Sequence, residues 1–282
     1  METKFEDYLN EKGFTESTRS LYVFLTEKFL QYSKDKGIKK QQVDYRMVLK
    51  YVAHLKRTNN DRSVTSHLNA LKHYFNAIGL PYNPIKINVR RTRTMVTTNT
   101  LNKSQLEKIY DEFPMKVSPT DVRNKVLMGL FMFQGIRSKE IKSLTTNCID
   151  LIDGTITIPQ GNKSNKRTLK LDHMQLKLME QYVKSSRQAI NPLVDDTLFV
   201  TQNGNNCIKG ILNQVYPKLK KLPYRPTLEL IRASVIKNWL KHYDLRAVQY
   251  MAGHRYISST ERYVQPDAEY LRGVIEQYHP IQ

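Results

Sequence analysis

Apolar residues recur every three or four positions along most of the first 80 residues, which is the period of an amphipathic α-helix. The period predicts a short helix before Gly13 and three longer ones at roughly 16–35, 43–57 and 62–78. Proline is absent from this stretch, so no residue in it forces a helix to end. The residues expected to face the core are Leu21, Phe24, Leu25, Phe29 and Tyr32 in the first long helix, Val43, Met47, Tyr51 and Leu55 in the second, and Val64, Leu68, Leu71, Phe75 and Ile78 in the third. Residues 1–80 are therefore predicted to form a small helical bundle.

This pattern stops in residues 81–100. The tract contains two prolines, no acidic residue and a basic cluster of Arg90, Arg91 and Arg93, and its apolar residues follow no period. These properties are typical of an extended linker. We therefore predict a basic linker between the bundle and a second domain over residues 101–282.

The second half of the chain mixes helical and strand periods. Helical spacing recurs at roughly 102–112, 121–134, 138–146 and 173–188. The first of these helices begins where Asn102 and Gln105 can form a capping box. Between the last two, residues 149–152, 155–158 and 167–171 predict three short strands, and Asp153-Gly154 is a strong hairpin turn. The predicted fold is mainly α with a small antiparallel β-sheet.

The charge of the chain indicates the kind of partner it binds. The sequence holds 45 Lys and Arg against 26 Asp and Glu, a net charge of +19. Residues 1–95 carry +9 and residues 96–282 carry +10, so both domains are basic in their own right. Two basic domains suit a polyanion, most often nucleic acid. A solvated lysine-rich face would give the same totals.

Several classes of protein are excluded by composition and motifs. No apolar run is long enough to span a membrane, and the start METKFEDYLNEKGF lacks the features of a secretory signal. Cys148 and Cys207 are too few for a disulfide scaffold or a zinc site. P-loop, GxGxxG, HExxH and paired CxxC motifs are absent, and neither the histidines nor the acids cluster. We expect a cytoplasmic protein without membrane contact, cofactor or metal.

Four segments of the second half keep residues that suit chemistry on a phosphate. They are the turn Gly135–Ile141 with Arg137, the hairpin loop with Lys163 and Lys166, the segment Leu230–Ser234 with Arg232, and the segment Met251–His254, followed nine residues later by Tyr263. Each has a common structural explanation when taken alone, because surface arginines, solvated lysines and turn histidines are frequent. Their order along the chain is the informative feature.

In this order the residues resemble those of the tyrosine recombinases, the lambda-integrase-like family that includes the Xer-like phage integrases. That family has an arginine after a GLR-type turn with an acid three residues later, a lysine on a β-hairpin, an HxxR box, an LGH-type motif and a tyrosine nine residues past its histidine. This sequence supplies, in turn, Arg137 with Glu140, Lys163, Arg232, Ala252-Gly253-His254 and Tyr263. The resemblance covers essentially the whole chain, and it implies an N-terminal SAM-like core-binding domain followed by a catalytic domain.

Two positions depart from the family pattern. Glu229 stands where the first histidine of the HxxR box is expected. The hairpin lysine is ambiguous, because alignment on the strand 167–171 places Asn162 at its position. A shift of one residue brings in Lys163, and Lys166 is the alternative.

The resemblance implies a site-specific recombinase that cleaves and rejoins DNA through a 3′-phosphotyrosyl bond, without metal or ATP. Tyr263 would be the nucleophile. Arg137 and Arg232 would each donate hydrogen bonds to non-bridging phosphate oxygens and offset the charge of the five-coordinate transition state. Lys163 would protonate the leaving 5′ oxygen.

The remaining candidate residues would support this reaction or bind DNA. His254 or Glu229 would assist proton transfer from the nucleophile, and Glu140 would orient Arg137 or cap a helix. The residues expected to contact the DNA backbone are Arg90, Arg91, Arg93, Lys166 and Arg167.

The implied partners are a double-stranded DNA recombination site and three further copies of the chain, which together form a homo-tetramer that passes through a Holliday junction. Apolar residues of the tail 267–278 follow a helical spacing and can dock on a neighbouring protomer or on their own domain. Two other interpretations stay open: a recombinase-like DNA-binding protein that cleaves weakly, which Glu229 favours, and a type IB topoisomerase-like enzyme. The target sequence and the choice among integration, excision, inversion and dimer resolution also stay open.

Overall fold

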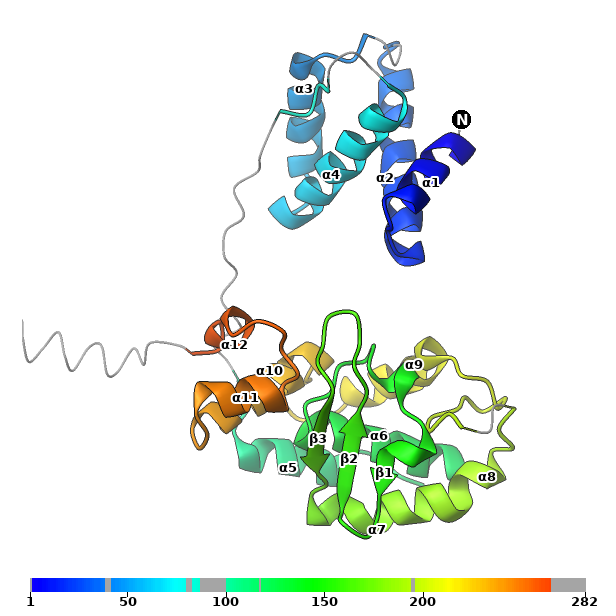
Figure 1. Ribbon diagram of the computed structural model, residues 1–282, viewed down its shortest axis with the longest axis vertical. Helices are drawn as coiled ribbons and strands as arrows, with labels where there is room; N and C mark the ends of the chain where they lie inside the picture. Colours follow the sequence, from blue (N-terminus) through cyan, green and yellow to red (C-terminus); the bar gives the residue numbers. More distant parts are fainter. Residues whose placement is uncertain are drawn as a thin grey trace, which may run out of the picture. The chain divides into compact units, whose positions relative to one another are not determined.

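The computed structural model describes residues 2–38, 42–79, 83–86, 100–116, 118–193 and 196–264. The chain divides into two compact units, residues 1–94 and 95–282. Both are mainly helical, and the second also holds a small sheet (Figure 1). The predicted fold class, mainly α with a small antiparallel β-sheet, is confirmed. Within the described ranges, no helix combines the length and the apolar character needed to cross a membrane.

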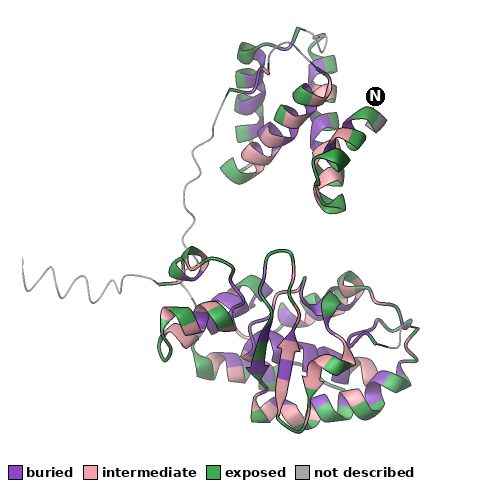
Figure 2. Cartoon of the chain, in the orientation of Figure 1, coloured by how far each residue is buried: buried purple, intermediate pink, exposed green. Residues whose placement is uncertain are grey.

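The described part of the N-terminal unit is a helical bundle. Its helices are α1 (Glu2–Glu11), α2 (Glu16–Asp35), α3 (Tyr45–Lys56) and α4 (Asp61–Ala77). The side chains of Asp44 and Asn60 cap α3 and α4 by accepting backbone N–H groups at 2.8 and 2.9 Å. The core is aromatic: the Phe29 ring lies edge-on to Tyr51 and Phe75, with centroids 5.0 and 5.9 Å apart. Figure 2 shows the buried stripes of these helices turned toward one another.

The inward face of α2 differs from the predicted one. Leu25 and Phe29 are buried as expected, whereas Leu21 and Phe24 are 45% and 50% exposed and Thr26 is buried. Successive helical residues are rotated by about 100°, so a face that includes Thr26 and Phe29 turns Phe24 toward solvent. The spacing of apolar residues did not show which stripe of α2 packs against α4.

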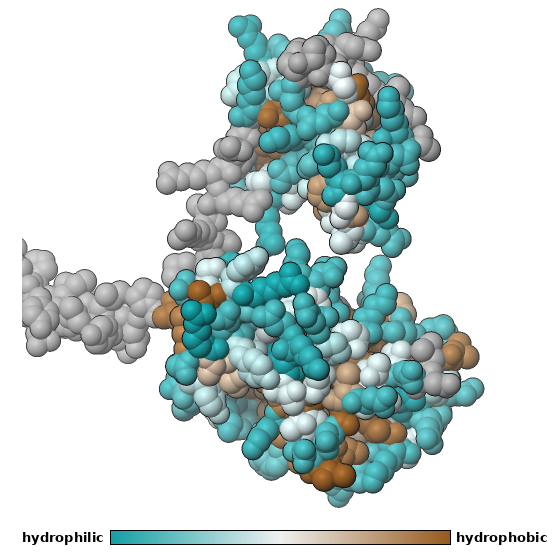
Figure 3. Space-filling model, in the orientation of Figure 1, coloured by the Kyte–Doolittle hydropathy of each residue, from teal (hydrophilic) through white to brown (hydrophobic). Residues whose placement is uncertain are grey.

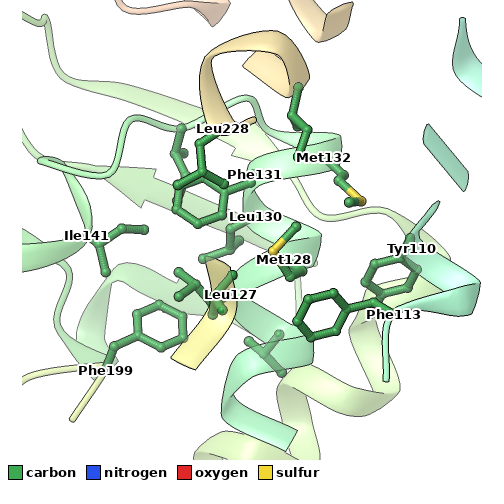
Figure 4. Packing of buried hydrophobic residues seen from close by; sticks show 14 of the residues in the cluster. Tyr110, Phe113, Leu127, Met128, Leu130, Phe131, Met132, Ile141, Phe199 and Leu228 are labelled. Atoms are coloured by element: carbon green, nitrogen blue, oxygen red, sulfur yellow. The ribbon is translucent and has the colours of Figure 1, made fainter. Parts of the chain in front are cut away.

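Helix α6 (Pro119–Phe133) forms the core of the C-terminal unit. Its segment 126–132 is apolar all round and every residue of it is buried, as expected for a helix surrounded by other elements. Figure 4 shows its side chains packed against Tyr110, Phe199 and Leu228, which come from distant parts of the chain. The other α-helices described in this unit are α5 (Lys103–Glu112), α7 (His173–Gln181), α8 (Arg187–Ala189), α9 (Ile208–Leu219), α10 (Leu228–Leu240), α11 (Leu245–Met251) and α12 (Ser258–Glu261). Of these, α5, α7, α8 and α10 pack directly against α6.

The sheet has the three predicted antiparallel strands, in the order β1 (Ile149–Asp150), β2 (Thr155–Ile158) and β3 (Arg167–Lys170). Ile158 pairs with Arg167, and Ile156 pairs with Leu169. These four side chains are buried, so the inward positions of β3 are Arg167 and Leu169. An arginine therefore occupies a core-facing position of the sheet.

Of two local predictions for this unit, one is confirmed and one is wrong. The capping box of Asn102 and Gln105 is confirmed at the start of α5. The helix predicted over 138–146 is wrong: the chain instead forms 3₁₀ turns at Ile141–Ser143 and Thr146–Cys148. The physical reason is backbone pairing with a distant segment, because the Leu144 carbonyl accepts the Leu198 N–H and the Thr146 N–H donates to the Asp196 carbonyl instead of within a helix.

Candidate active site

Arg232 connects three segments at one end of the C-terminal unit. It is buried on α10, and its Nη1 donates to the Gly135 carbonyl while its Nη2 donates to the Ala252 carbonyl at 2.7 Å. The turn after α6 and the end of α11 are thereby fixed to α10. Burial, and next the positive charge of Arg137, lower the pKa of Arg232. The side chain is held in place by its hydrogen bonds although its charge is destabilised there.

Arg137 lies on the turn that follows α6. Gly135 begins this turn with a φ of +53°, a backbone conformation that favours glycine. The Arg137 side chain is 31% exposed, but its Nη1 is buried and has no hydrogen-bond partner among the described residues, although Glu140 Oε1 lies 3.7 Å away. Burial lowers the pKa of Arg137, and the charge of Glu140 partly opposes this effect. The exposed part of the Arg137 side chain leaves its guanidinium able to receive a phosphate oxygen.

Glu140 is the acid at the centre of this end of the unit. Its carboxylate accepts the Arg137 backbone N–H at 2.8 Å and accepts Arg167 Nη1 and Nη2 at 2.9 Å each. Burial opposes its ionisation, but the hydrogen bonds and charge of Arg167 outweigh burial and lower the pKa of Glu140 to about 2. Glu140 is therefore ionised at neutral pH and orients the Arg137 turn.

The same contacts correct the prediction for Arg167. Its side chain is 0% exposed, so in this structure it has no surface on which DNA could bind. The strand alternation carries the signal for this position, because Arg167 shares the parity of Leu169 and Leu171, both of which are buried.

His254 is buried directly after the positive-φ residue Gly253. Its Nε2 lies 3.3 Å from Arg232 Nη2, and its Nδ1 lies 2.8 Å from the Thr260 hydroxyl. Because a guanidinium only donates, Nε2 must accept, which puts the ring proton on Nδ1 facing Thr260. Burial, followed by the charges of Arg232 and Arg137, lowers the pKa of His254 to about 3. The imidazole is therefore neutral at physiological pH.

Tyr263 lies against this histidine in the same chain. The two rings stack with centroids 5.9 Å apart and an interplanar angle of 19°. The Tyr263 backbone N–H donates to the Thr260 carbonyl at 2.9 Å. A charge on Tyr263 also raises the pKa of both Arg137 and Arg232. Its hydroxyl is thus within electrostatic reach of both guanidiniums in cis.

The lysine-bearing hairpin between β2 and β3 is attached to the same end. The Asn165 backbone N–H donates to the Gly253 carbonyl at 3.2 Å, and Ser164 forms an isolated β-bridge with His254. Lys163 and Lys166 flank these two residues and are both exposed. Most of the visible face of either unit is hydrophilic (Figure 3).

The remaining predicted residues lie apart from this cluster or outside the described residues. Glu229 is exposed one helical turn before Arg232, and its charge acts on Tyr216 of α9. Arg90, Arg91 and Arg93 lie outside the described residues. Among the residues that the structure does describe, no group of three or more His, Cys, Asp or Glu side chains is arranged to hold a metal ion.

Thr260 supports the site although no sequence pattern predicts it. The Thr260 side chain binds His254, and its carbonyl binds the backbone of Tyr263. A threonine three residues before a tyrosine carries no distinguishing pattern, so no signal in one sequence could have found it.

Comparison with known proteins finds matches to both units of the chain. The sequence profile of the Phage integrase family matches residues 99–269, and that of the Phage integrase SAM-like domain matches residues 2–77. Tyrosine recombinase XerA of Thermococcus kodakarensis is 22% identical over 95% of this chain and 92% of its own length. Tyrosine recombinase XerC of Histophilus somni is 31% identical over 57% of this chain and 55% of its own length.

Two solved structures share the fold. XerH recombinase in a post-cleavage complex with palindromic difH substrate has a TM-score of 0.73 and 21% identity, covering 92% of this chain and 79% of its own. The Tn1549 transposon integrase in complex with transposon right end DNA has a TM-score of 0.71 and 16% identity, covering 98% of both chains.

Fold and profile together define a tyrosine recombinase. The chain belongs to the Phage integrase family, with an N-terminal SAM-like domain and a C-terminal catalytic domain. It is a site-specific DNA recombinase that cleaves and rejoins DNA.

The buried neutral state of His254 predicts a pH-dependent stability. In the unfolded chain a histidine titrates near 6.5, whereas the folded His254 has a pKa of about 3. Between these values the unfolded state binds the extra proton, so stability is lost as the pH falls. On going from pH 7 to pH 5, we expect wild type to lose about 1–2 kcal/mol more than His254→Gln in urea unfolding experiments.

The exposed His173 supplies the control for this experiment. His173→Gln should keep the wild-type dependence on pH. Equal losses in wild type and His254→Gln would show that His254 takes up a proton in the folded state.

Proposed function

We propose that Tyr263 is the nucleophile of strand cleavage and attacks a DNA phosphorus held by Arg137 and Arg232. The observation that carries this proposal is the stacking of Tyr263 on His254 within electrostatic reach of both arginines. The Tyr263 oxygen forms a bond to phosphorus as the bond from phosphorus to the 5′ oxygen breaks. The resulting 3′-phosphotyrosyl bond keeps the energy of the phosphodiester, so rejoining needs no ATP.

The two arginines divide the work on the phosphate. Arg137 contributes a guanidinium on a partly exposed side chain, and Arg232 contributes a buried charge that is already anchored to backbone carbonyls. Such preorganised donors stabilise the charge that develops on the non-bridging oxygens, typically by about 3–4 kcal/mol for each donor. No metal ion is needed for this step.

We assign to His254 the acceptance of the tyrosine proton. Its Nε2 is the acceptor nitrogen, and it becomes free for that proton when Arg232 donates to the bound phosphate instead of to His254. Its pKa is low because burial and the neighbouring arginines oppose a charged imidazole. A bound phosphodiester adds a negative charge that offsets those arginines, so the basicity of His254 rises when substrate is present. Glu229 is exposed and its charge acts on Tyr216, which favours His254 over Glu229 for this role.

The leaving 5′ oxygen requires a proton, which we assign to a lysine on the β2–β3 hairpin. Lys163 is the first candidate and Lys166 is the alternative. The backbone contacts of Ser164 and Asn165 hold this loop beside His254 and so support the assignment. Arg90, Arg91, Arg93 and Lys166 remain candidates for contacts to the DNA backbone, and access to DNA fits a cytoplasmic protein.

We further propose that four protomers assemble on two paired DNA sites and exchange strands through a Holliday junction. A pocket of about 780 Å³ on the catalytic domain, between α5, β3, α10 and α11, supports such an assembly. Its wall includes Met132, Phe133, Trp239, Tyr243 and Met251. The tail 267–278 lies outside the described residues, and its apolar residues at helical spacing suit this pocket on a neighbouring protomer.

Formation of a covalent adduct tests the nucleophile. Nicked suicide DNA made from sequences that flank the gene should become covalently attached to wild type, because the short strand that carries the 5′ hydroxyl diffuses away. Tyr263→Phe should bind the same DNA and form no adduct, whereas Tyr256→Phe, which changes a nearby exposed tyrosine, should form it normally. A Tyr263→Phe protein that still forms the adduct would assign the nucleophile to another residue.

The general acid is identified by changing the leaving group. Loss of the acid should slow cleavage by about 10²–10⁴-fold. A 5′-bridging sulfur leaves without a proton, so it should restore cleavage by the variant that lacks the acid and by no other slow variant. We expect this rescue for Lys163→Ala; rescue of Lys166→Ala alone would assign the role to Lys166.

Removal of residues 267–282 tests the assembly. The truncated protein should bind a single half-site but should not form the paired-site complex that native gels or light scattering detect for wild type. Normal tetramer formation by the truncated protein would place the contact between protomers elsewhere.

A further inference from the structure

Arg167 reaches the site from its core-facing position on β3. Both of its terminal nitrogens donate to the Glu140 carboxylate at 2.9 Å, and the side chains of both residues are almost fully buried. A buried bidentate ion pair of this kind is rigid, and removal of one partner leaves an uncompensated charge. The position of the Glu140 carboxylate is therefore set by Arg167.

The contact controls how Glu140 meets Arg137. Glu140 Oε1 is 2.9 Å from Arg167 Nη1 but 3.7 Å from Arg137 Nη1, while Oε2 accepts the Arg137 backbone N–H. Arg167 thus holds the carboxylate where it can orient the Arg137 turn without forming a close ion pair with the Arg137 guanidinium. If Arg167 were absent, the carboxylate could close on Arg137 and occupy the nitrogen that now has no partner.

Arg167 also contacts the segment that carries His254. A Cβ added to Gly253 would overlap the Arg167 guanidinium, and Gly253 has a φ of +61°. The glycine before His254 therefore leaves room for Arg167 as well as adopting a left-handed conformation. Two residues before Arg167, the Asn165 N–H binds the Gly253 carbonyl. One side chain thereby packs the lysine-bearing hairpin against the Arg137 turn and the His254 segment.

From these contacts we infer that Arg167 is a positioning residue for DNA cleavage: it holds Glu140 away from the Arg137 guanidinium and keeps that guanidinium available for the scissile phosphate. This role rests on the proposed function, since it acts through Arg137. It replaces the contact to DNA that the sequence had suggested for Arg167.

The test is single-turnover cleavage of nicked suicide DNA at saturating protein, at a temperature where melting curves show every variant folded. Arg167→Met should cleave about 10–100-fold more slowly than wild type and should retain its affinity for DNA. Arg167→Lys, which keeps the charge and one donor, should lose less and serves as the second variant if Arg167→Met fails to fold. In an Arg137→Lys background, replacement of Arg167 should cost little more, because both changes affect the same guanidinium.

Arg123 provides the matched control. It is also fully buried, but it binds the Val200 carbonyl, Asn124 and Gln214 in a separate network. Arg123→Met should lower the melting temperature and leave the cleavage rate of the folded protein unchanged. If Arg123→Met slows cleavage as much as Arg167→Met does, the loss is a general effect of removing a buried arginine and the positioning role is overturned.

Two further outcomes separate this inference from the proposed function. The positioning role alone is overturned if wild type cleaves DNA and Arg167→Met cleaves at the wild-type rate. It is also overturned if wild type cleaves DNA and the losses caused by the Arg167 and Arg137 changes are fully additive. If wild-type protein bound to its site forms no adduct through Tyr263, the proposed function fails, and the role of Arg167 fails with it.

Discussion

Three guanidinium groups, those of Arg137, Arg167 and Arg232, converge around the carboxylate of Glu140 at one end of the catalytic domain. Burial destabilises each of these charges, and the nearby charges of the same sign add to this effect. The lowered pKa values of Arg137 and Arg232 express that cost. One carboxylate cannot neutralise three cations, so the cluster keeps an excess of positive charge. A DNA phosphodiester carries a negative charge, which would offset this excess of positive charge.

The fold must hold these like charges together before DNA arrives. It does so with hydrogen bonds to backbone carbonyls that cannot move independently of the core. Arg232 is tied to Gly135 and Ala252, and Arg167 lies in the inward row of a sheet that packs on the hydrophobic cluster around α6. The apolar core therefore supplies the rigidity that electrostatic repulsion would otherwise disrupt.

The same cations determine the chemical state of His254. Burial and, after it, their charges lower the pKa of the imidazole and keep it neutral, and Arg232 fixes its tautomer by donating to Nε2. Thr260 completes the arrangement on the opposite side of the ring and is joined through its backbone to Tyr263. The residues on which cleavage is proposed to depend are therefore coupled electrostatically and mechanically, and a bound phosphate would change the environment of all of them at once.

The sequence was informative wherever the signal is local or is preserved as an order along the chain. Helical and strand periods located the bundle, the apolar α6 and the three-stranded sheet, and the capping box of Asn102 and Gln105 marked the start of α5. The order from Arg137 to Tyr263 identified the family, because catalytic residues keep their sequence order even when they lie far apart. Periods and caps depend on residues a few positions apart, and the match to the family depends only on the order of residues along the chain.

Tertiary structure decided which partners these residues have. The stripe of α2 that is buried depends on its packing against α4, and the segment 138–146 is not helical because its backbone at Leu144 and Thr146 pairs with residues 196–198. The period of β3 placed Arg167 on the inward face, yet an isolated inward arginine is indistinguishable in sequence from one that grips DNA. Charge, period and residue order thus determined the class of protein and its candidate residues. Only the folded chain decided that Arg167 pairs with a buried carboxylate, because long-range pairing depends on distances that one sequence does not contain.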